Sequence, residues 1–110
     1  MSTTTQQEMA ARRRRLALAA ALEAIGSVEA LALVEPLAYQ PRSTFELAGN
    51  AGLDSHSAEE LLRGLANAGV VAPWSKGSWQ FTPIGGEVWQ AVAPLLRRLG
   101  VDSGSLPSWS

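Results

Sequence analysis

The sequence contains no cysteine and only one histidine among its 110 residues. Without thiols the chain can form no disulfide, thiolate nucleophile or zinc–thiolate site, so redox sensing by thiols is excluded. A single histidine leaves too few nitrogen ligands for a transition metal, and we expect neither a metal nor another cofactor. No apolar run reaches the roughly 18 residues of a membrane span, so we expect a soluble protein with no membrane contact.

The N-terminal region resembles a secretion signal only superficially. Residues 16–21 are apolar and follow four arginines, but the run is rich in alanine and Glu23 interrupts it. We therefore expect a helix of a cytoplasmic protein. No nucleophile–base pair, carboxylate pair or phosphate-binding loop is recognisable, because Gly85-Gly86 lies at the opening of a helix and not after a strand. We expect no enzymatic activity.

Length and composition favour a single globular domain. A chain of this length, 46% hydrophobic and 17% charged, buries roughly 65% of its unfolded surface, which suffices for one modest core. We expect the domain to span residues 6–99. A flexible N-terminus (residues 1–5) would precede it, and a flexible tail (residues 100–110) that includes Trp109 would follow it.

Two helices are expected before residue 40. The first covers residues 6–25, where apolar residues at i, i+4 and i+7 form one stripe, namely Leu18, Leu22 and Ile25. Gly26-Ser27 separates it from a second helix over residues 28–39. Pro36 lacks a backbone donor and should kink or end that second helix near Glu35.

A helix-turn-helix is expected after a short connector. Ser43 and Glu46 have the Ser-x-x-Glu spacing of a capping box, which predicts a helix from Thr44 to about residue 51. Gly52 can adopt the positive φ that the tight turn after this helix needs. The turn should lead directly into a second helix.

That second helix, over about residues 55–68, is the candidate recognition helix. Asp54 or Ser55 should cap its start, and Gly69 should end it. Its buried stripe is expected to consist of Ala58, Leu61, Leu62 and Leu65. Its opposite face is polar and would remain free for a partner.

A β-hairpin, the wing (residues 70–82), should follow. Strands are expected at residues 70–74 and 79–81, joined by the polar turn at residues 75–78. Thr82-Pro83 should then open a closing helix that Pro94 kinks or restarts before about residue 99. The tryptophans of this region, Trp74, Trp79 and Trp89, are expected to pack the wing onto the body.

The segment over residues 31–93 resembles two kinds of winged-helix protein. The motifs Phe45-Glu46-Leu47-Ala48, Gly52-Leu53, Ala68-Gly69-Val70-Val71 and Thr82-x-x-Gly85 resemble winged-helix repressors of the ArsR and MarR type. Leu62-Arg63-Gly64-Leu65-Ala66-x-x-Gly69-Val70 and Phe81-Thr82-Pro83-Ile84-Gly85 are also similar to the N-terminal dimerisation domain of small-molecule O-methyltransferases. The first resemblance implies DNA binding, and the second implies dimerisation without it. The Rossmann-like catalytic domain of those methyltransferases has no counterpart in these 110 residues, so we do not expect a methyltransferase. We predict a mainly α protein with a small β-wing, a winged helix-turn-helix with an added long N-terminal helix.

Charge argues partly against DNA binding by the recognition helix. Residues 43–93 contain five acidic residues and two basic residues, a net charge of −3, whereas affinity for DNA comes mostly from Lys and Arg at phosphates. In ArsR-type repressors, the positions that match Glu59 and Glu60 usually carry small polar or basic residues. Half of the chain's arginines instead lie in one turn of the N-terminal helix. In a dimer, two such turns could flank a DNA site.

The candidate DNA-contacting residues come from three segments: Arg12, Arg13, Arg14, Arg15, Ser55, His56, Ser57, Glu60, Arg63, Lys76 and Ser78. Each cation also has a simpler interpretation. In that interpretation the arginine run is a solvated face with Glu8 paired to Arg12, and Arg63 pairs with Glu59 or Glu60. His56 is then an exposed turn residue, and Lys76 only keeps the turn solvated.

Dimerisation is expected because the apolar stripe of the N-terminal helix would otherwise lie exposed. The preferred hypothesis is a cytoplasmic homodimeric transcriptional regulator, such as a repressor, that binds duplex DNA. The alternative is a winged-helix module that dimerises or binds another protein without binding DNA. DNA binding predicts that the arginine run and Lys76 lie on the same face as the exposed side of residues 55–67, and the alternative predicts that they diverge.

Overall fold

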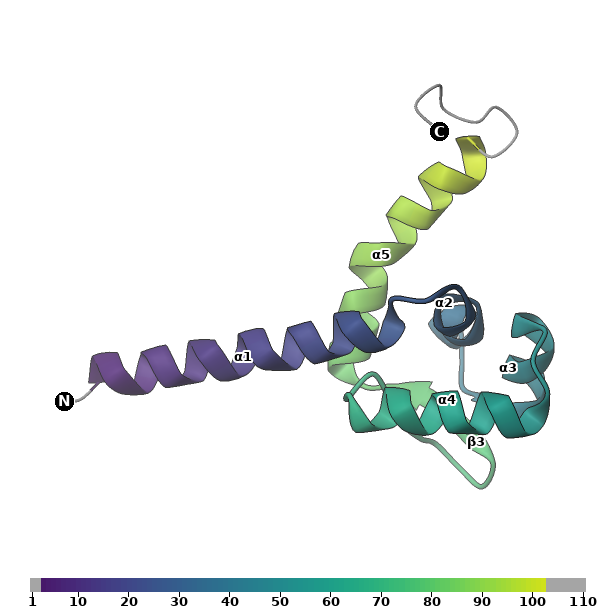
Figure 1. Ribbon diagram of the computed structural model, residues 1–110, viewed down its shortest axis with the longest axis horizontal. Coiled ribbons are helices and arrows are strands. Elements are labelled where there is room, and N and C mark those ends of the chain that lie inside the picture. Colours follow the sequence, from purple (N-terminus) through teal and green to yellow (C-terminus); the bar gives the residue numbers. More distant parts are fainter. Residues whose placement is uncertain (1–2, 103–110) are drawn as a thin grey trace.

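A computed structural model describes residues 3–102, and it is mainly α-helical with one small antiparallel sheet (Figure 1). In chain order the elements are α1 (Thr3–Ile25), α2 (Val28–Val34), the 3₁₀ helix η1 (Glu35–Ala38), β1 (Arg42–Ser43), α3 (Thr44–Ala51), α4 (Ser55–Asn67), β2 (Val71–Pro73), β3 (Ser78–Phe81) and α5 (Pro83–Asp102). The predicted fold class is confirmed.

Both long helices extend further than expected. α1 begins at Thr3 and not near residue 6, and α5 continues through Pro94 to Asp102, beyond the expected end near residue 99. The remaining terminal residues, with Trp109 and most of the expected tail, lie outside the described residues. Among the described residues, no single helix is long and apolar enough to cross a membrane. The α1 helix and the α2–η1 segment, which meet at a bend of 98°, together have the length and composition of a membrane span, by these two criteria alone.

The chain breaks where the sequence predicted. Ser27 caps α2 by accepting a hydrogen bond from the backbone N–H of Ala30 at 3.0 Å. α2 ends at Val34, and Pro36 lies in the tighter η1 turn that follows. Because proline removes a backbone donor, the change from α to 3₁₀ geometry at this point has a direct local cause.

One core joins all the helices. Its buried members are Ala21, Ile25, Ala30, Leu33, Val34, Leu37, Leu47, Ala48, Ala58, Leu62, Leu65, Val70, Val71, Val88 and Trp89. Of the long helix α1, only residues near its C-terminal end belong to this core, and its N-terminal half projects away from the body (Figure 1). α1 therefore buries much less of itself than a core helix normally does.

The sheet contains a strand that the sequence did not reveal. Its order is β1-β3-β2, and β1 pairs with β3 antiparallel, with Arg42 opposite Trp79. β1 has only two residues, too few for a period-2 pattern, and it exists because the backbone is already extended as it approaches the cap of α3. The wing is thus tied to the helix-turn-helix along one strand.

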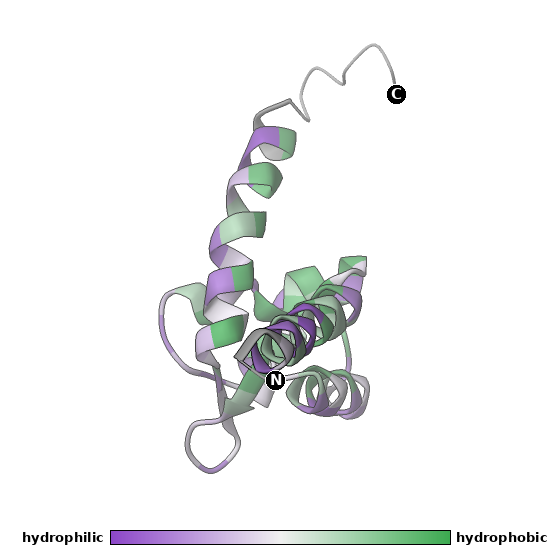
Figure 2. Ribbon diagram, turned by 90° about the vertical axis from the view of Figure 1, so that its left-hand side faces the viewer, coloured by the Kyte–Doolittle hydropathy of each residue, from purple (hydrophilic) through white to green (hydrophobic). Residues whose placement is uncertain are grey.

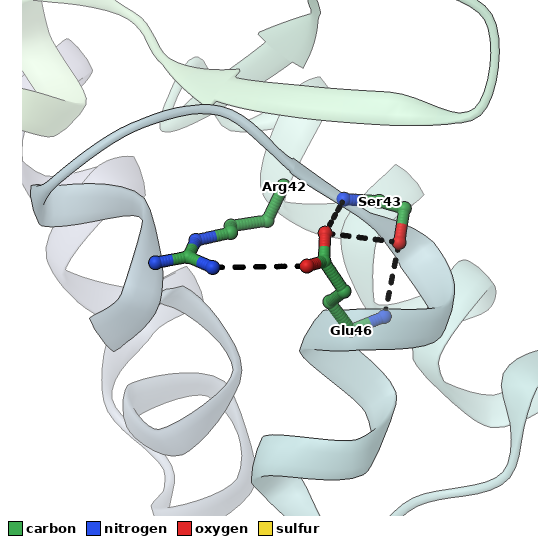
Figure 3. A network of polar contacts seen from close by, with 3 residues as sticks. All are labelled: Arg42, Ser43 and Glu46. Atoms are coloured by element: carbon green, nitrogen blue, oxygen red, sulfur yellow. Dashed lines mark hydrogen bonds and ion pairs between the residues drawn. The ribbon is translucent and has the colours of Figure 1, made fainter.

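A polar network fixes the start of α3 (Figure 3). The hydroxyl of Ser43 accepts from the backbone N–H of Glu46 at 3.1 Å, and the Glu46 carboxylate accepts from the backbone N–H of Ser43 at 3.1 Å. Arg42 adds an ion pair to Glu46 at 3.7 Å. The hydrogen bond from the Ser43 backbone is the main cause that lowers the pKa of Glu46. The predicted capping box is confirmed.

The junction between the wing and α5 depends on Thr82 and Gly85. The Thr82 hydroxyl donates to the carbonyl of Gly69, and its backbone N–H donates to the carbonyl of Val70 at 3.0 Å. The Thr82 hydroxyl also accepts a hydrogen bond from the backbone N–H of Gly85 at 2.9 Å. A Cβ on Gly85 would lie 1.9 Å from the carbonyl oxygen of Val70. Glycine is therefore required here because α5 starts against the backbone of Val70, the residue before β2.

Candidate nucleic-acid interface

The turn between α3 and α4 is built as the sequence predicted. Gly52 adopts φ 71°, in the left-handed region, and ends α3. Asp54 caps α4, because its carboxylate accepts from the backbone N–H of Ser57 at 2.7 Å. This hydrogen bond is the main cause that lowers the pKa of Asp54. The cap and the glycine together fix the angle at which α4 leaves the turn.

α4 has a buried side and an exposed side. The expected stripe packs into the core, with Leu61 only half-buried. Four of the candidate contacts, Ser55, His56, Glu60 and Arg63, are exposed. Ser57 is half-buried, and its hydroxyl donates to Asp54 at 3.2 Å, so it belongs to the helix cap. The remaining four are available to a partner.

His56 and Arg63, on this exposed face, each lie beside a carboxylate. His56 Nε2 lies 3.3 Å from Glu60 Oε2, and Arg63 lies 3.6 Å from Glu59, each at i, i+4 spacing. The side chains of His56, Glu60 and Arg63 are at least 67% exposed, so water screens these contacts, and the Arg63–Glu59 pair contributes about 0.3–0.5 kcal/mol. Either side chain can leave its carboxylate and bind a phosphate at a small cost in free energy. The exposed face of α4 nevertheless carries no excess positive charge.

The wing differs from its prediction at one tryptophan. Trp89 is buried, and Trp79 is half-buried with its indole N–H donating to the Thr44 hydroxyl at 2.9 Å, so both anchor the body as expected. Trp74 is 59% exposed, so the expectation that it packs the wing onto the body is wrong. Lys76 at the tip is exposed, and Ser78 is half-buried.

The four consecutive arginines are all exposed but do not form one patch. Because successive helical residues are rotated by about 100°, a run of four encircles the helix. Arg13 and Arg14 line a groove between α1 and α5, whereas Arg12 and Arg15 line a different surface of α1 together with Glu8. The charge of the run is thus divided between two sides of α1.

The run also lies far from the other candidate contacts. It belongs to the half of α1 that projects from the body, whereas the wing turn lies at the other end of the molecule, beneath β3 in Figure 1. α4 begins at the end that is farther from the projecting part of α1. Within one chain, the arginine run and the wing turn therefore lie apart (Figure 1).

An apolar groove of about 700 Å³ runs between α1 and α5. Its walls include Leu18 and Leu22 from α1, and Ile84, Val88 and Val92 from α5. Leu18, Leu22 and Ile84 are each 45–48% exposed. Further along α5, one side of the helix remains hydrophobic (Figure 2), and Leu95 and Leu99 are more than half exposed. The expected apolar stripe of the N-terminal helix is thus partly open to solvent.

Two features of the surface were absent from the sequence interpretation. The exposure of Trp74 depends on its place in the hairpin register, which composition does not give. The contribution of Ile84 and Val92 to the groove depends on how α5 crosses α1. Among the described residues, no group of three or more His, Asp or Glu side chains lies close enough together to hold a metal.

Comparison with known proteins identifies the fold. No protein-family model and no curated protein matches the sequence. The chain is similar to a homodimeric winged helix-turn-helix DNA-binding domain from Mycobacterium bovis, described as a possible ArsR-family transcriptional regulator. That match has 17% identity and a TM-score of 0.64, over 79% of this chain and 83% of that one. The fold is a winged helix-turn-helix.

Two other solved structures share this architecture. One is a MarR family transcriptional regulator from Silicibacter pomeroyi, with 17% identity and a TM-score of 0.60 over 96% of this chain and 77% of that one. The other is N,N-8-amino-8-demethyl-D-riboflavin dimethyltransferase from Streptomyces davawensis, with 26% identity and a TM-score of 0.51. This chain covers only 24% of that enzyme's length, and 78% of this chain takes part. Both resemblances expected from the sequence are therefore found among the structures.

Proposed function

We propose that this protein is a transcriptional regulator that binds duplex DNA as a homodimer. The observation that carries the proposal is the exposed polar face of α4, which a capped turn and a tied wing hold in a fixed position. A helix presented in this way fits the major groove. The two regulators among the similar structures support the same assignment. Because duplex DNA lies inside the cell, the proposed location is cytoplasmic. The proposal assigns the protein no catalytic role.

Within this proposal, α4 supplies the base contacts. Arg63 can grip guanine or a phosphate after it releases Glu59, and Glu60 can accept a hydrogen bond from the amino group of cytosine. Ser55 and His56, in the first turn, would contact the backbone or base edges. Ser78 would support Lys76 in the wing. The acidic residues of α4 repel phosphates. We therefore expect α4 to disfavour binding that depends on phosphate contacts alone.

The dimer would form through α1 and α5. These helices carry seven of the exposed large hydrophobic side chains, namely Met9, Leu16, Leu18, Leu22, Ile84, Leu95 and Leu99. An exposed apolar surface of this kind marks an interface. A twofold axis through these helices would present two copies of α4 to a palindromic site. The same axis would also place the partner's arginine run beside the DNA site. Within one chain, that run lies far from α4.

A salt titration of binding to random-sequence duplex DNA tests the proposal. Wild type should bind in the micromolar range at low salt and weaken steeply as salt rises. Replacement of Arg12, Arg13, Arg14 and Arg15 by alanine should reduce the salt slope. The matched control is Arg97→Ala with Arg98→Ala, two exposed arginines near the far end of α5. This control should leave the slope unchanged, and equal slopes in all three proteins would remove the arginine run from the DNA surface.

A second function is favoured by the charge of α4 and the divergence of the arginine run. A winged-helix module that binds a protein needs neither free cations on α4 nor a continuous basic face. The similarity to part of a dimethyltransferase is compatible with such a module. Absence of DNA binding at low salt, with an intact dimer in sedimentation analysis, would establish this alternative over the regulator.

A further inference from the structure

Trp74 is an exposed aromatic residue on the outer face of the wing. In the β2–β3 register Pro73 lies opposite Trp79, and the backbone N–H of Trp74 continues the ladder by donating to the carbonyl of Ser78 at 2.9 Å. Side chains alternate between the two faces of a hairpin. The Trp79 indole points to Thr44 on α3. Trp74, on the opposite face, therefore points away from the body, which agrees with its 59% exposure.

The charge around Trp74 differs from that of the first turn of α4. No acidic residue occurs between Glu60 and Glu87, and this stretch contains both Arg63 and Lys76. Lys76 has no ion-pair partner in the described part of the chain, in contrast to His56 and Arg63. The wing tip thus offers a phosphate an unpaired cation. The carboxylate that lies near it, that of Glu46, is held by the backbone of Ser43 opposite Ser78 and is paired with Arg42.

The wing tip is also held in place before any partner binds. The backbone N–H of Ser78 donates to the carbonyl of Ser75 at 2.8 Å, and Gly77 adopts φ 76° in the turn. The carbonyl of Gly77 accepts from the backbone N–H of Thr44 at 3.0 Å, which ties the tip to the start of α3. A rigid tip loses little conformational entropy on binding.

We propose that Trp74 and Lys76 form a DNA contact of the wing, with the indole packed on a deoxyribose and the ammonium on the adjacent phosphate. This inference rests on the proposed DNA-binding function and adds to it a contact residue. Aromatic side chains offer a large apolar contact area with few rotatable bonds, which suits the apolar sugar surface of a groove.

Trp74→Ala and Lys76→Ala separate the two parts of this contact. Binding to one duplex is measured by fluorescence anisotropy at several salt concentrations. Lys76→Ala should lower the salt slope by about one unit, because one phosphate contact is lost. Trp74→Ala should weaken binding roughly tenfold, as expected for an interface anchor, and leave the slope unchanged. Tyr39→Ala removes another aromatic side chain, 82% exposed beside α5, and should bind like wild type.

A second readout follows Trp74 directly. Iodide should quench the fluorescence of wild type more than that of Trp74→Phe, and this difference should disappear when DNA is bound. If Trp74→Ala binds DNA like wild type, the inference is wrong while the regulator proposal stands. If Trp74→Ala changes the oligomeric state and leaves DNA affinity unchanged, Trp74 is a protein contact and the inference is wrong. Failure of wild type to bind DNA at low salt would overturn both proposals.

Discussion

Replacement of Gly85 by alanine should destabilise the protein, whereas the same replacement of Gly64 should stabilise it. Both glycines lie in helices and have negative φ, so neither needs glycine for its backbone angles. They differ in their surroundings. A Cβ on Gly85 would lie 1.9 Å from the carbonyl oxygen of Val70, whereas a Cβ on Gly64 would meet no atom within 4 Å.

The sizes of the two effects follow from these distances. To relieve the Gly85 contact, the start of α5 and Val70 must separate by about 1 Å, which breaks the hydrogen bonds from Thr82 to Val70. Two such bonds contribute about 1–3 kcal/mol in total, and the helix propensity of alanine returns up to about 1 kcal/mol. A net loss of about 1–2 kcal/mol is expected. At Gly64 only the helix propensity of alanine acts, so the free energy of unfolding should rise by about 0.5–1 kcal/mol.

Thermal and urea unfolding followed by circular dichroism would measure both variants at one protein concentration, because the proposed dimerisation would make stability concentration-dependent. Gly85→Ala should lower the melting temperature by roughly 4–8 °C and Gly64→Ala should raise it by roughly 2–4 °C. A Gly85→Ala protein as stable as wild type would refute the reasoning, since it would mean that α5 does not start in contact with Val70. Gly49→Ala in α3 repeats the Gly64 control, because it too has no atom within 4 Å.

Three further predictions concern the cap, the wing and the dimer. Ser43→Ala should cost about 0.5–2 kcal/mol in urea unfolding by removing the α3 cap. Since the folded state lowers the pKa of Glu46, its contribution is complete above the ordinary value of 4.5 and is lost as pH falls through the lowered pKa. The backbone N–H of Ser43, the main cause of the lowered pKa, is retained in Ser43→Ala, so the comparison for pH is Glu46→Gln, which removes the titrating carboxylate. Wild type should lose more stability than Glu46→Gln over that range, and parallel curves would contradict this. Trp79→Phe should cost about 0.5–1.5 kcal/mol by removing the indole hydrogen bond, and an unchanged unfolding midpoint would show that this bond contributes nothing. Leu22→Glu should shift sedimentation toward monomer while Asn67→Glu, which adds the same charge at an exposed position of α4, should not; equal behaviour would remove α1 from the interface.

Much of the local structure could be predicted because its causes are local. The capping box at Ser43, the positive φ at Gly52 and the change of helix type at Pro36 each depend on residues within a few positions of one another. The apolar stripe of α4 needs only helical periodicity, and its burial was predicted with one residue half-buried. The resemblance to winged-helix proteins supplied the order of the elements that these signals delimit.

The candidate site was less predictable, because its properties depend on contacts between distant segments. Whether Arg63 was free or paired depended on rotamers, and the structure pairs it with Glu59. The arginine run was expected to act as one cluster, but helical rotation and the direction of α1 divide it and carry it away from the wing. The two-residue strand β1 needs its distant partner β3 as well as the locally extended backbone before the cap of α3.

The sequence by itself determined where α3 and α4 begin and end, since caps and glycines act through adjacent backbone groups. It also determined the acidic balance of the helix-turn-helix. Only the tertiary structure decided that Trp74 faces solvent while Trp79 packs, that Gly85 has no room for a side chain, and that α1 and α5 leave an open apolar groove. Each of these depends on which surfaces meet across many residues of chain, and that is a property of packing that no short stretch of sequence carries.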